Sequence, residues 1–434
     1  MEYVFRTLNY LGSKLRLLDF IEENVLKVAA EGQGICDLFA GSGCVSYKLS
    51  GRFNVTSCDI QFYSKVICNA LLGNVSISVD DVERFIASVR KGKDVFECFN
   101  TLIEIEERAI KDKDTEILTE ILENGSVEVH HIENRPTVLQ QQLQDTYEKL
   151  KNKGLLNEKS LISRYYGGVY FSYRQSVWID VILEAICKFV PKADRDFYLA
   201  ALLSTASDIV GTVGKHFAQP LKARDSKGNI KITVYNKAVK DKTVDTVELY
   251  RDWLLRYISL PKSGSDFFTI QGDYLDCLKN LPDSVTTVYA DPPYTRDHYS
   301  RFYHVLETIA LRDIPTLSIT NIRGETHISN GIYRNDRHQS PFCIKSKAIE
   351  AFRAMFMIVS QNRKNLLLSY SPYDETKNSH PRVVTMQQLL ELARKYFRNV
   401  ELISAGSFKH NKLNSAEHFL DASEEAEVLI VCSN

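Results

Sequence analysis

The sequence has no apolar run of membrane-spanning length, no signal-peptide core at its N-terminus and no excess of charge of either sign. Its nine cysteines are scattered without CxxC pairs or nearby histidines, so neither a disulfide framework nor a zinc site is expected. This cysteine usage indicates the reducing cytoplasm. The formal net charge of −1 excludes a uniformly basic protein, so any nucleic-acid surface must be a local patch.

The most informative stretch is residues 286–303. Thr286–Ala290 is β-branched and aromatic, which predicts a buried strand, and Asp291-Pro292-Pro293-Tyr294 ends it abruptly. Pro292 has no N–H, and Pro293 restricts the residue before it to extended geometry, so no helix can begin here. We therefore expect a stiff turn at the carboxyl end of a strand, where open α/β sheets bind ligands.

This turn offers the groups that would hold the exocyclic amine of a nucleobase. Such an amine is a poor nucleophile because its lone pair is delocalised into the ring. The Asp291 carboxylate and the Pro292 carbonyl can accept its two N–H bonds, and Tyr294 can stack on the base, which is worth about 1–3 kcal/mol. Taken alone, the same residues also suit a rigid strand-to-loop turn with a capping aspartate.

Residues 34–60 predict a strand, a glycine turn, a helix and a second strand. Gly41 and Gly43 let the backbone approach a ligand closely, but the third glycine of a dinucleotide site is replaced by Ser46. Asp59 ends the second strand 22 residues past Asp37, at the position where such units bind ribose hydroxyls. A βαβ unit without a ligand is the alternative.

Seven segments have the composition of strands, and amphipathic helices such as 347–361 separate most of them. We expect no helix between the last two strands, so they should pair antiparallel. The sequence thus predicts an α/β fold with a Rossmann-like, seven-stranded, mostly parallel sheet that ends in an antiparallel hairpin. The expected strands are residues 35–39, 54–60, 267–271, 286–290, 365–370, 399–408 and 427–433.

Residues 76–265 break this rhythm and predict a largely helical insertion, with charged helices near 81–90 and 104–123. Within it, residues 164–174 mix tyrosines, glycines and arginines, which suits a nucleic-acid surface and a half-buried core equally. Residues 215–242 carry eight cationic side chains against two aspartates, and their turn-forming residues indicate a loop and hairpin. This segment is either a DNA footprint or a solvated loop.

A long irregular loop over residues 312–345 is a further candidate, since loops of this length in compact domains are usually functional. Its cationic side chains could grip phosphates. The DNA-contact residues predicted from local charge are Lys215, Lys222, Arg224, Lys227, Arg334, Arg337 and His338.

In order along the chain, these motifs resemble the DNA adenine-N6 methyltransferases in which cofactor motifs precede catalytic ones. The match runs from Tyr10-Leu11-Gly12-Ser13-Lys14 through residues 37–43, Asp59 and residues 272–274 to Asp291-Pro292-Pro293-Tyr294. It continues through residues 368–371 to the closing residues 427–430, and so covers nearly the whole chain outside the insertion. The ordered set is far more specific than any one member.

The resemblance implies S-adenosylmethionine as cofactor and double-stranded DNA as substrate. It implies that residues 1–75 bind the cofactor, 76–265 recognise the target sequence and 266–434 form the catalytic half. In such enzymes the Lys14 position meets the methionine carboxylate, Asp59 holds the ribose and Asp273 holds the adenine amine of the cofactor. The cofactor-binding residues implied are Tyr10, Ser13, Lys14, Asp37, Phe39, Gly41, Gly43, Asp59, Asp273 and Tyr274, and the catalytic residues are Asp291, Pro292, Pro293 and Tyr294.

Four alternatives differ from this reading, three in substrate and one in class. The same chemistry could act on an amine of RNA, on cytosine N4 or on a protein glutamine, although Asp291 resembles the adenine enzymes and serine is commoner there in cytosine enzymes. The chain could also be a DNA-binding module without turnover, against which the complete set of motif aspartates argues. No metal is needed for the transfer. A cognate restriction endonuclease or defence-system partner is implied only by the resemblance.

Overall fold

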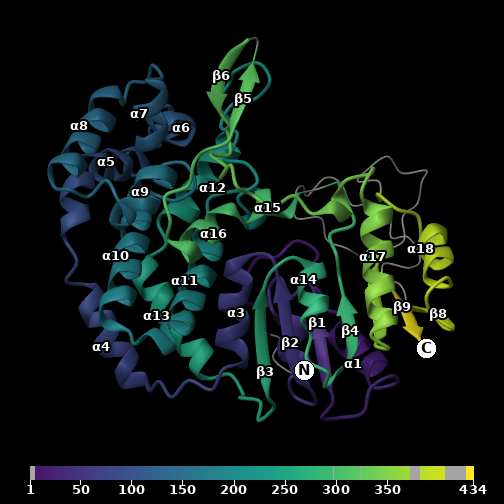
Figure 1. Ribbon diagram of the computed structural model, residues 1–434. Coiled ribbons are helices and arrows are strands. Elements are labelled where there is room, and N and C mark those ends of the chain that lie inside the picture. The colour runs from purple at the N-terminus through teal and green to yellow at the C-terminus, as the bar shows by residue number, and fades with distance from the viewer. Residues whose placement is uncertain (1–4, 297, 323, 372–381, 406–426) are drawn as a thin grey trace. The chain divides into compact units, whose positions relative to one another are not determined.

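The computed structural model describes residues 5–296, 298–322, 324–371, 382–405 and 427–434 (Figure 1). The chain separates into two compact units. The first comprises residues 1–74, 261–300 and 338–434, and the second comprises 75–260 and 301–337. This division places residues 301–337 with the helical insertion, whereas the sequence analysis had placed them in the C-terminal half. The functions assigned to the three predicted segments stay predictions.

The first unit is built on one seven-stranded sheet with the order β3-β2-β1-β4-β7-β9-β8. Five strands run parallel, and β9 pairs antiparallel with both β7 and β8. The predicted mostly parallel sheet with a terminal antiparallel hairpin is therefore confirmed. Residues 406–408, at the end of one predicted strand, lie outside the described residues. The strands are β1 (Gly34–Asp37), β2 (Asn54–Asp59), β3 (Phe267–Gln271), β4 (Val285–Ala290), β7 (Asn365–Tyr370), β8 (Asn399–Ser404) and β9 (Val428–Ser433).

The central strands are mostly buried because the sheet is covered on both faces. All four residues of β1 are buried, as are Leu366–Leu368 of β7. The long helix α17 packs its face of Phe352, Met355 and Phe356 into the same core. The helices of this unit are α1 (Leu18–Val25), α2 (Cys44–Leu49), α3 (Phe62–Leu72), α14 (Tyr274–Lys279), α17 (Ala348–Gln361) and α18 (Met386–Ala393), and α15 (Tyr299–Phe302) spans the junction with the second unit.

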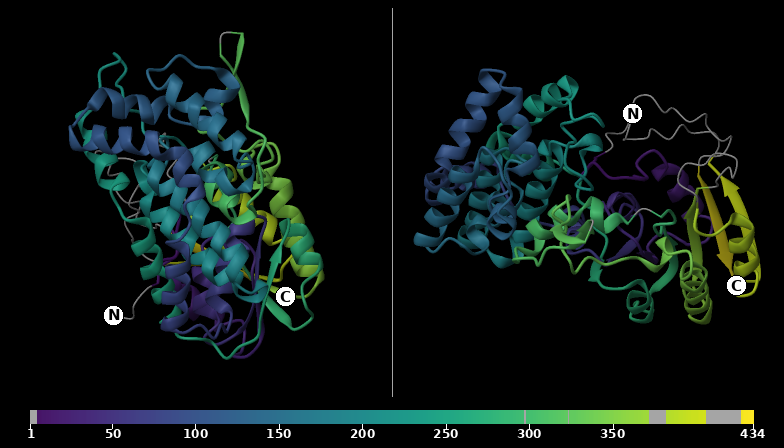
Figure 2. Two further views of the ribbon diagram at one scale, coloured as in Figure 1. Left: turned by 90° about the vertical axis from the view of Figure 1, so that its left-hand side faces the viewer. Right: turned by 90° about the horizontal axis from the view of Figure 1, so that it is seen from above.

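The second unit is almost entirely helical and forms one group of helices, drawn in blue and teal in both views of Figure 2. Tyr166, Tyr170 and Tyr173 are fully buried, so the tyrosine-rich segment belongs to the core and not to a surface. Its helices are α4 (Val79–Val89), α5 (Asp94–Lys111), α6 (Thr115–Asn124), α7 (Val127–Glu133), α8 (Gln140–Asn152), α9 (Leu161–Tyr166), α10 (Tyr173–Phe189), α11 (Arg195–Ile209), α12 (Ile232–Lys242), α13 (Thr246–Ile258) and α16 (His304–Leu311).

Two segments of this unit are more ordered than the sequence predicted. Helix α12 occupies part of the expected loop, since Val234, Ala238 and Val239 pack against α6 at helical spacing between the lysines. The presumed irregular loop contains the hairpin β5 (Ile319–Ile322) and β6 (Glu325–Ile328), which projects beyond the helices of its own unit (Figures 1 and 2). Four-residue strands are too short to give a recognisable alternation.

Across the described residues, no helix combines the length and apolarity needed to span a bilayer.

Candidate active site

The parallel strands deliver their carboxyl ends to one edge of the sheet, and a pocket of about 930 Å³, counted out to its open mouth, lies there within the first unit. Residues directly after four strands line it, and the N-terminal segment supplies Tyr10, Leu11 and Lys14. The linings from the strand ends are Leu38 and Phe39 after β1, Asp59 to Gln61 after β2, Gly272 to Tyr274 after β3, and Asp291 to Tyr294 after β4.

The glycine turn after β1 fixes the carboxylate of Asp59. The Gly41 N–H donates to Asp59 Oδ2 at 2.9 Å, and the Gln61 N–H donates to Oδ1 at 2.8 Å. Gly41 has φ +52, and an added Cβ there would lie 2.6 Å from the Tyr10 hydroxyl. Burial raises the pKa of Asp59, while the two N–H donors lower it. The result is an oriented acceptor at the wall of the pocket.

Asp37 lies beneath the pocket and does not line it. Ser46 Oγ donates to Asp37 Oδ2 at 2.7 Å, and Ser57 Oγ donates to Ser46 Oγ at 2.7 Å. This explains why a serine stands where a dinucleotide site would have glycine, because its hydroxyl satisfies a carboxylate that the sheet buries. Burial raises the pKa of Asp37 to about 7, and the nearby carboxylates of Asp291 and Asp59 add to this shift.

Lys14 joins the two ends of the chain at the predicted catalytic turn. Its Nζ lies 2.9 Å from Asp291 Oδ2 and 3.3 Å from Glu427 Oε1. Ser369 Oγ, near the end of β7, donates to the same Glu427 oxygen at 2.6 Å. Burial disfavours the charge on Lys14, but the two carboxylates outweigh it and raise the pKa of the ammonium well above its usual value.

The same network sets the ionisation of Asp291. Burial raises the pKa of Asp291 to about 6, Lys14 opposes this shift and Glu427 adds to it. The side chain keeps 22% of its surface exposed, so its carboxylate can still meet a ligand. At neutral pH, Asp291 is therefore mostly an ionised acceptor.

Tyr294 is fixed on several sides. Its ring centroid lies 4.8 Å from that of Tyr370, and the guanidinium carbon of Arg382 lies 4.9 Å above the ring. The Val383 N–H donates to the Tyr294 carbonyl at 3.2 Å, and the Cys343 thiol donates to the Pro293 carbonyl at 3.5 Å. The ring is therefore held as a preformed wall of the pocket.

The structure brings together all four predicted catalytic residues and six predicted cofactor residues as pocket linings. Ser13, Asp37, Gly41 and Gly43 lie outside the lining, and the last two shape the turn behind it. The roles of all these residues stay predictions. Sequence reasoning missed Glu427 as a partner of Lys14. It also missed Tyr299, which lines the same pocket with its ring centroid 6.1 Å from that of Tyr10.

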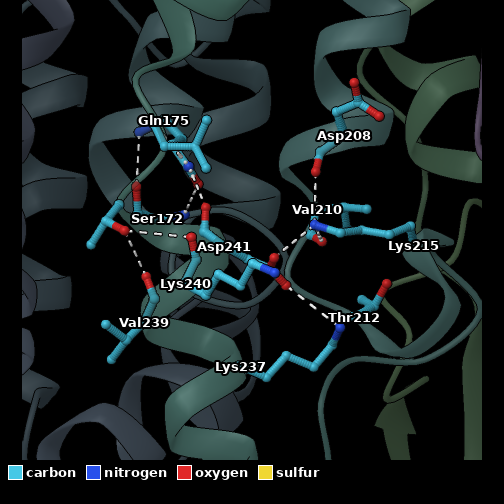
Figure 3. Close-up of polar contacts among 12 residues, drawn as sticks. Ser172, Gln175, Asp208, Val210, Thr212, Lys215, Lys237, Val239, Lys240 and Asp241 are labelled. Carbon is cyan, nitrogen blue, oxygen red and sulfur yellow. Dashed lines mark hydrogen bonds and ion pairs between the residues drawn. The ribbon is translucent and has the colours of Figure 1, made fainter. Parts of the chain in front are cut away.

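The residues predicted to contact DNA fall into different environments. Lys222, Arg224 and Arg337 line one groove of the second unit, Lys227 is exposed outside it, and His338 lines the pocket of the first unit. Lys215 donates to the Asp208 and Val210 carbonyls at 2.7 and 3.1 Å and to Asp241 at 2.8 Å (Figure 3). Arg334 is buried and pairs with Asp313 and Asp336. These last two cations already serve internal ion pairs, so our proposals do not use them.

Among the residues that the structure describes, no group of three or more His, Cys, Asp and Glu side chains has a metal-binding arrangement.

Comparisons with known proteins agree with this geometry. Residues 10–157 match the family described as D12 class N6 adenine-specific DNA methyltransferase. The chain is 26% identical over 391 residues to Modification methylase LlaI of Lactococcus lactis subsp. lactis, covering 90% of this chain and 49% of that protein. It is 22% identical over 377 residues to Type II methyltransferase M.NlaIII of Neisseria lactamica, covering 83% and 85% of the two chains.

A third relative, Type II methyltransferase M.FokI of Planomicrobium okeanokoites, is 23% identical over 373 residues, covering 84% of this chain and 44% of that protein. The chain thus spans about half the length of two of these relatives. The sheet order, the pocket at its carboxyl edge and the motif residues around that pocket agree with this similarity to the D12 class N6 adenine-specific DNA methyltransferases, which the family match places in residues 10–157.

Proposed function

We propose that this protein transfers a methyl group from S-adenosylmethionine to N6 of an adenine that is flipped out of duplex DNA. The observation that carries the proposal is the ion pair of Lys14 and Asp291 in the same pocket as Asp59 and Asp273. One pocket thus offers an oriented amine acceptor beside the wall on which a nucleoside-like cofactor would lie.

The match to this family implies the use of S-adenosylmethionine, and the residues present fit it. Asp59, held by two N–H donors, is suited to accept from ribose hydroxyls. Phe39 and Tyr274 stack at 6.2 Å between ring centroids and give an apolar surface for the adenine, next to Asp273. When bound, this cofactor supplies a methyl group that its sulfonium already activates for transfer.

The protein's own residues would then prepare the target amine. Asp291 and the Pro292 carbonyl accept its two N–H bonds, which localises the nitrogen lone pair for attack. Lys14 keeps Asp291 ionised and fixes its orientation, and Asp291 can take up the proton that the methylated amine releases. Tyr294, supported by Tyr370 and Arg382, stacks on the flipped base and offsets part of the few kcal/mol that flipping costs.

Positioning supplies most of the rate enhancement in this scheme. Holding an amine in line with an activated methyl group is worth up to about 7–11 kcal/mol in favourable cases. The turn suits this task because both prolines restrict its backbone, while the Cys343 thiol and the Val383 N–H hold it from outside.

The setting of the reaction is also a proposal. The relatives named as modification and type II methyltransferases support a role in restriction–modification, with a cognate endonuclease as partner. All nine cysteines are free thiols, which supports a reducing cytoplasm as the location.

Expression in a host whose DNA lacks adenine methylation, followed by sequencing with detection of modified bases, tests the proposal. We expect N6-methyladenine at one short recurring sequence. Expression of Asp291→Asn at the same level is the control, and it should leave the DNA unmodified. Modified cytosine in the DNA would show that cytosine is the target. Unmodified DNA together with methylated RNA would show that RNA is the substrate.

A further inference from the structure

A second hollow lies wholly within the second unit. Its lining comes from α6 and α7, from residues 219–224, and from residues that flank the β5–β6 hairpin. Five cationic side chains line it, and Glu123 is the one carboxylate among its lining residues. The cations are Arg135, Lys222, Arg224, Arg301 and Arg337. In a chain of net charge −1, such a groove concentrates positive charge.

Internal ion pairs account for two of these cations. Arg135 pairs with Glu133, and Arg224 lies 3.3 Å from Glu123. In the part of the chain that the structure describes, Lys222, Arg301 and Arg337 have no carboxylate within ion-pair distance. None of the three is therefore held in an ion pair, and each can pair with a bound anion.

Arg301 and Arg337 share one aromatic ring. Their guanidinium carbons lie 5.8 and 4.8 Å from the centroid of Tyr333, within the range of cation–π contact. The Tyr333 hydroxyl donates to the Ala218 carbonyl, and its ring meets His304 edge-on at 5.1 Å. The Tyr333 ring thus holds the guanidinium groups of Arg301 and Arg337 near each other, although their like charges repel.

The hydrogen-bond donors of Arg337, a lining residue of the groove, are only partly satisfied by the protein. Its Nε donates to the Arg334 carbonyl at 2.7 Å, and its Nη2 lies 3.4 Å from Ser318 Oγ. Its Nη1 is buried and has no hydrogen-bond partner. Burial, and then the neighbouring charge of Arg301, lower the pKa of this guanidinium. One edge of the side chain is anchored while the other lacks the acceptor that a buried N–H requires.

We propose that Arg301, Arg337 and Tyr333 form a phosphate notch, which holds the backbone of the DNA substrate in the groove of the second unit. The inference rests on the proposed function for the identity of the phosphate. Arginine suits it because the planar guanidinium presents paired N–H donors to phosphate oxygens and stacks on aromatic rings at the same time. Lys222, exposed on the same groove, extends the track to a second phosphate.

The salt dependence of DNA binding tests the notch. Duplex affinity is measured by fluorescence anisotropy at several salt concentrations for the full chain and for Arg301→Gln/Arg337→Gln. The matched control is Arg84→Gln/Arg90→Gln, which removes the same charge from exposed side chains of the second unit outside the groove. The notch variant should lose about one unit of the log–log salt slope per lost phosphate contact and bind at least tenfold more weakly. The control should keep the wild-type slope.

Three further measurements separate the possible failures. Cofactor affinity of the notch variant should equal that of wild type, because the cofactor pocket lies in the other unit. Arg301→Gln alone, at an exposed position, repeats the test without changing the half-buried Arg337. Arg337→Lys should retain most of the salt slope but bind more weakly, since it keeps the charge and loses the planar fork.

If wild type methylates adenine while the notch variant matches the control in slope and affinity, the notch is wrong and the proposed function stands. If binding depends on the notch but no methyl group reaches DNA, the proposed function is wrong and the phosphate site stands. A wild-type chain that binds inorganic phosphate at the notch but no duplex would overturn the assignment to DNA.

Discussion

Replacing Lys14 with methionine should move the pH dependence of methyl transfer. The Lys14 ammonium lies 2.9 Å from Asp291, and their side chains are only 6% and 22% exposed, so solvent screens the pair weakly. An opposite charge at this distance lowers a carboxyl pKa by about 1–3 units. Loss of Lys14 should therefore raise the pKa of Asp291 from about 6 by that amount. Because only the ionised carboxylate accepts the amine, activity at pH 7 should fall by roughly two- to a hundredfold and recover at alkaline pH.

Glu427→Gln is the matched variant, because it should shift the pKa of Asp291 in the opposite direction. The Glu427 carboxylate raises the pKa of Asp291, so its neutral isostere should shift the acidic limb of the profile to lower pH. The assay is kcat/KM for DNA across the pH range, at saturating S-adenosylmethionine, so that any effect of Lys14 on cofactor binding does not enter. Circular dichroism checks that both variants fold. Acidic limbs that stay at the wild-type position in both variants would refute the role of this network.

The remaining predictions concern the cofactor wall, the stacking ring and the buried carboxylate. Asp59→Ala should weaken cofactor binding by about ten- to a hundredfold, as expected for a lost charged hydrogen bond of about 1.5–3 kcal/mol; equal affinity in calorimetry would remove Asp59 from the site. Tyr294→Phe should be mild, whereas Tyr294→Ala should lose about 1–3 kcal/mol of stacking and slow turnover, and equal rates for the two would exclude stacking. Burial raises the pKa of Asp37 to about 7, so the native state binds this proton more tightly than the unfolded chain does. The free energy of unfolding should therefore decrease as the pH rises from about 4 to 7. In Asp37→Asn, the unfolding free energy from denaturant titrations should depend less on pH over this range. A pH dependence equal to that of wild type would mean that another group causes the decrease.

The sheet could be predicted because its strands carry their signal locally. Ile35 and Cys36 of β1 and Leu366–Leu368 of β7 are apolar residues that the structure buries completely. The pocket followed from the same reasoning, since side chains after parallel strands must meet at one edge. Asp59 and Asp291 are therefore in one pocket although 232 residues separate them along the chain.

The contacts that tune the site could not be predicted in the same way. Nothing near Lys14 in the sequence indicates that Glu427 would be its partner, because β9 enters the sheet beside β7 only through the fold. The local charge of a segment also does not indicate whether a cationic side chain points to solvent or to the interior. Lys215 and Arg334 look like surface cations in the sequence, yet both turn inward to carboxylates, whereas Arg337 lines the groove and keeps one donor without a partner.

The chemical identity of the methylated product tests the central claim most directly. Purified protein is incubated with duplex DNA and S-adenosylmethionine labelled in its methyl group, and the DNA is digested to nucleosides for mass spectrometry. The account predicts label in N6-methyldeoxyadenosine for wild type, and none for Asp291→Ala that still binds the cofactor. Label in N4-methyldeoxycytidine, or undiminished adenine methylation by Asp291→Ala, would contradict it.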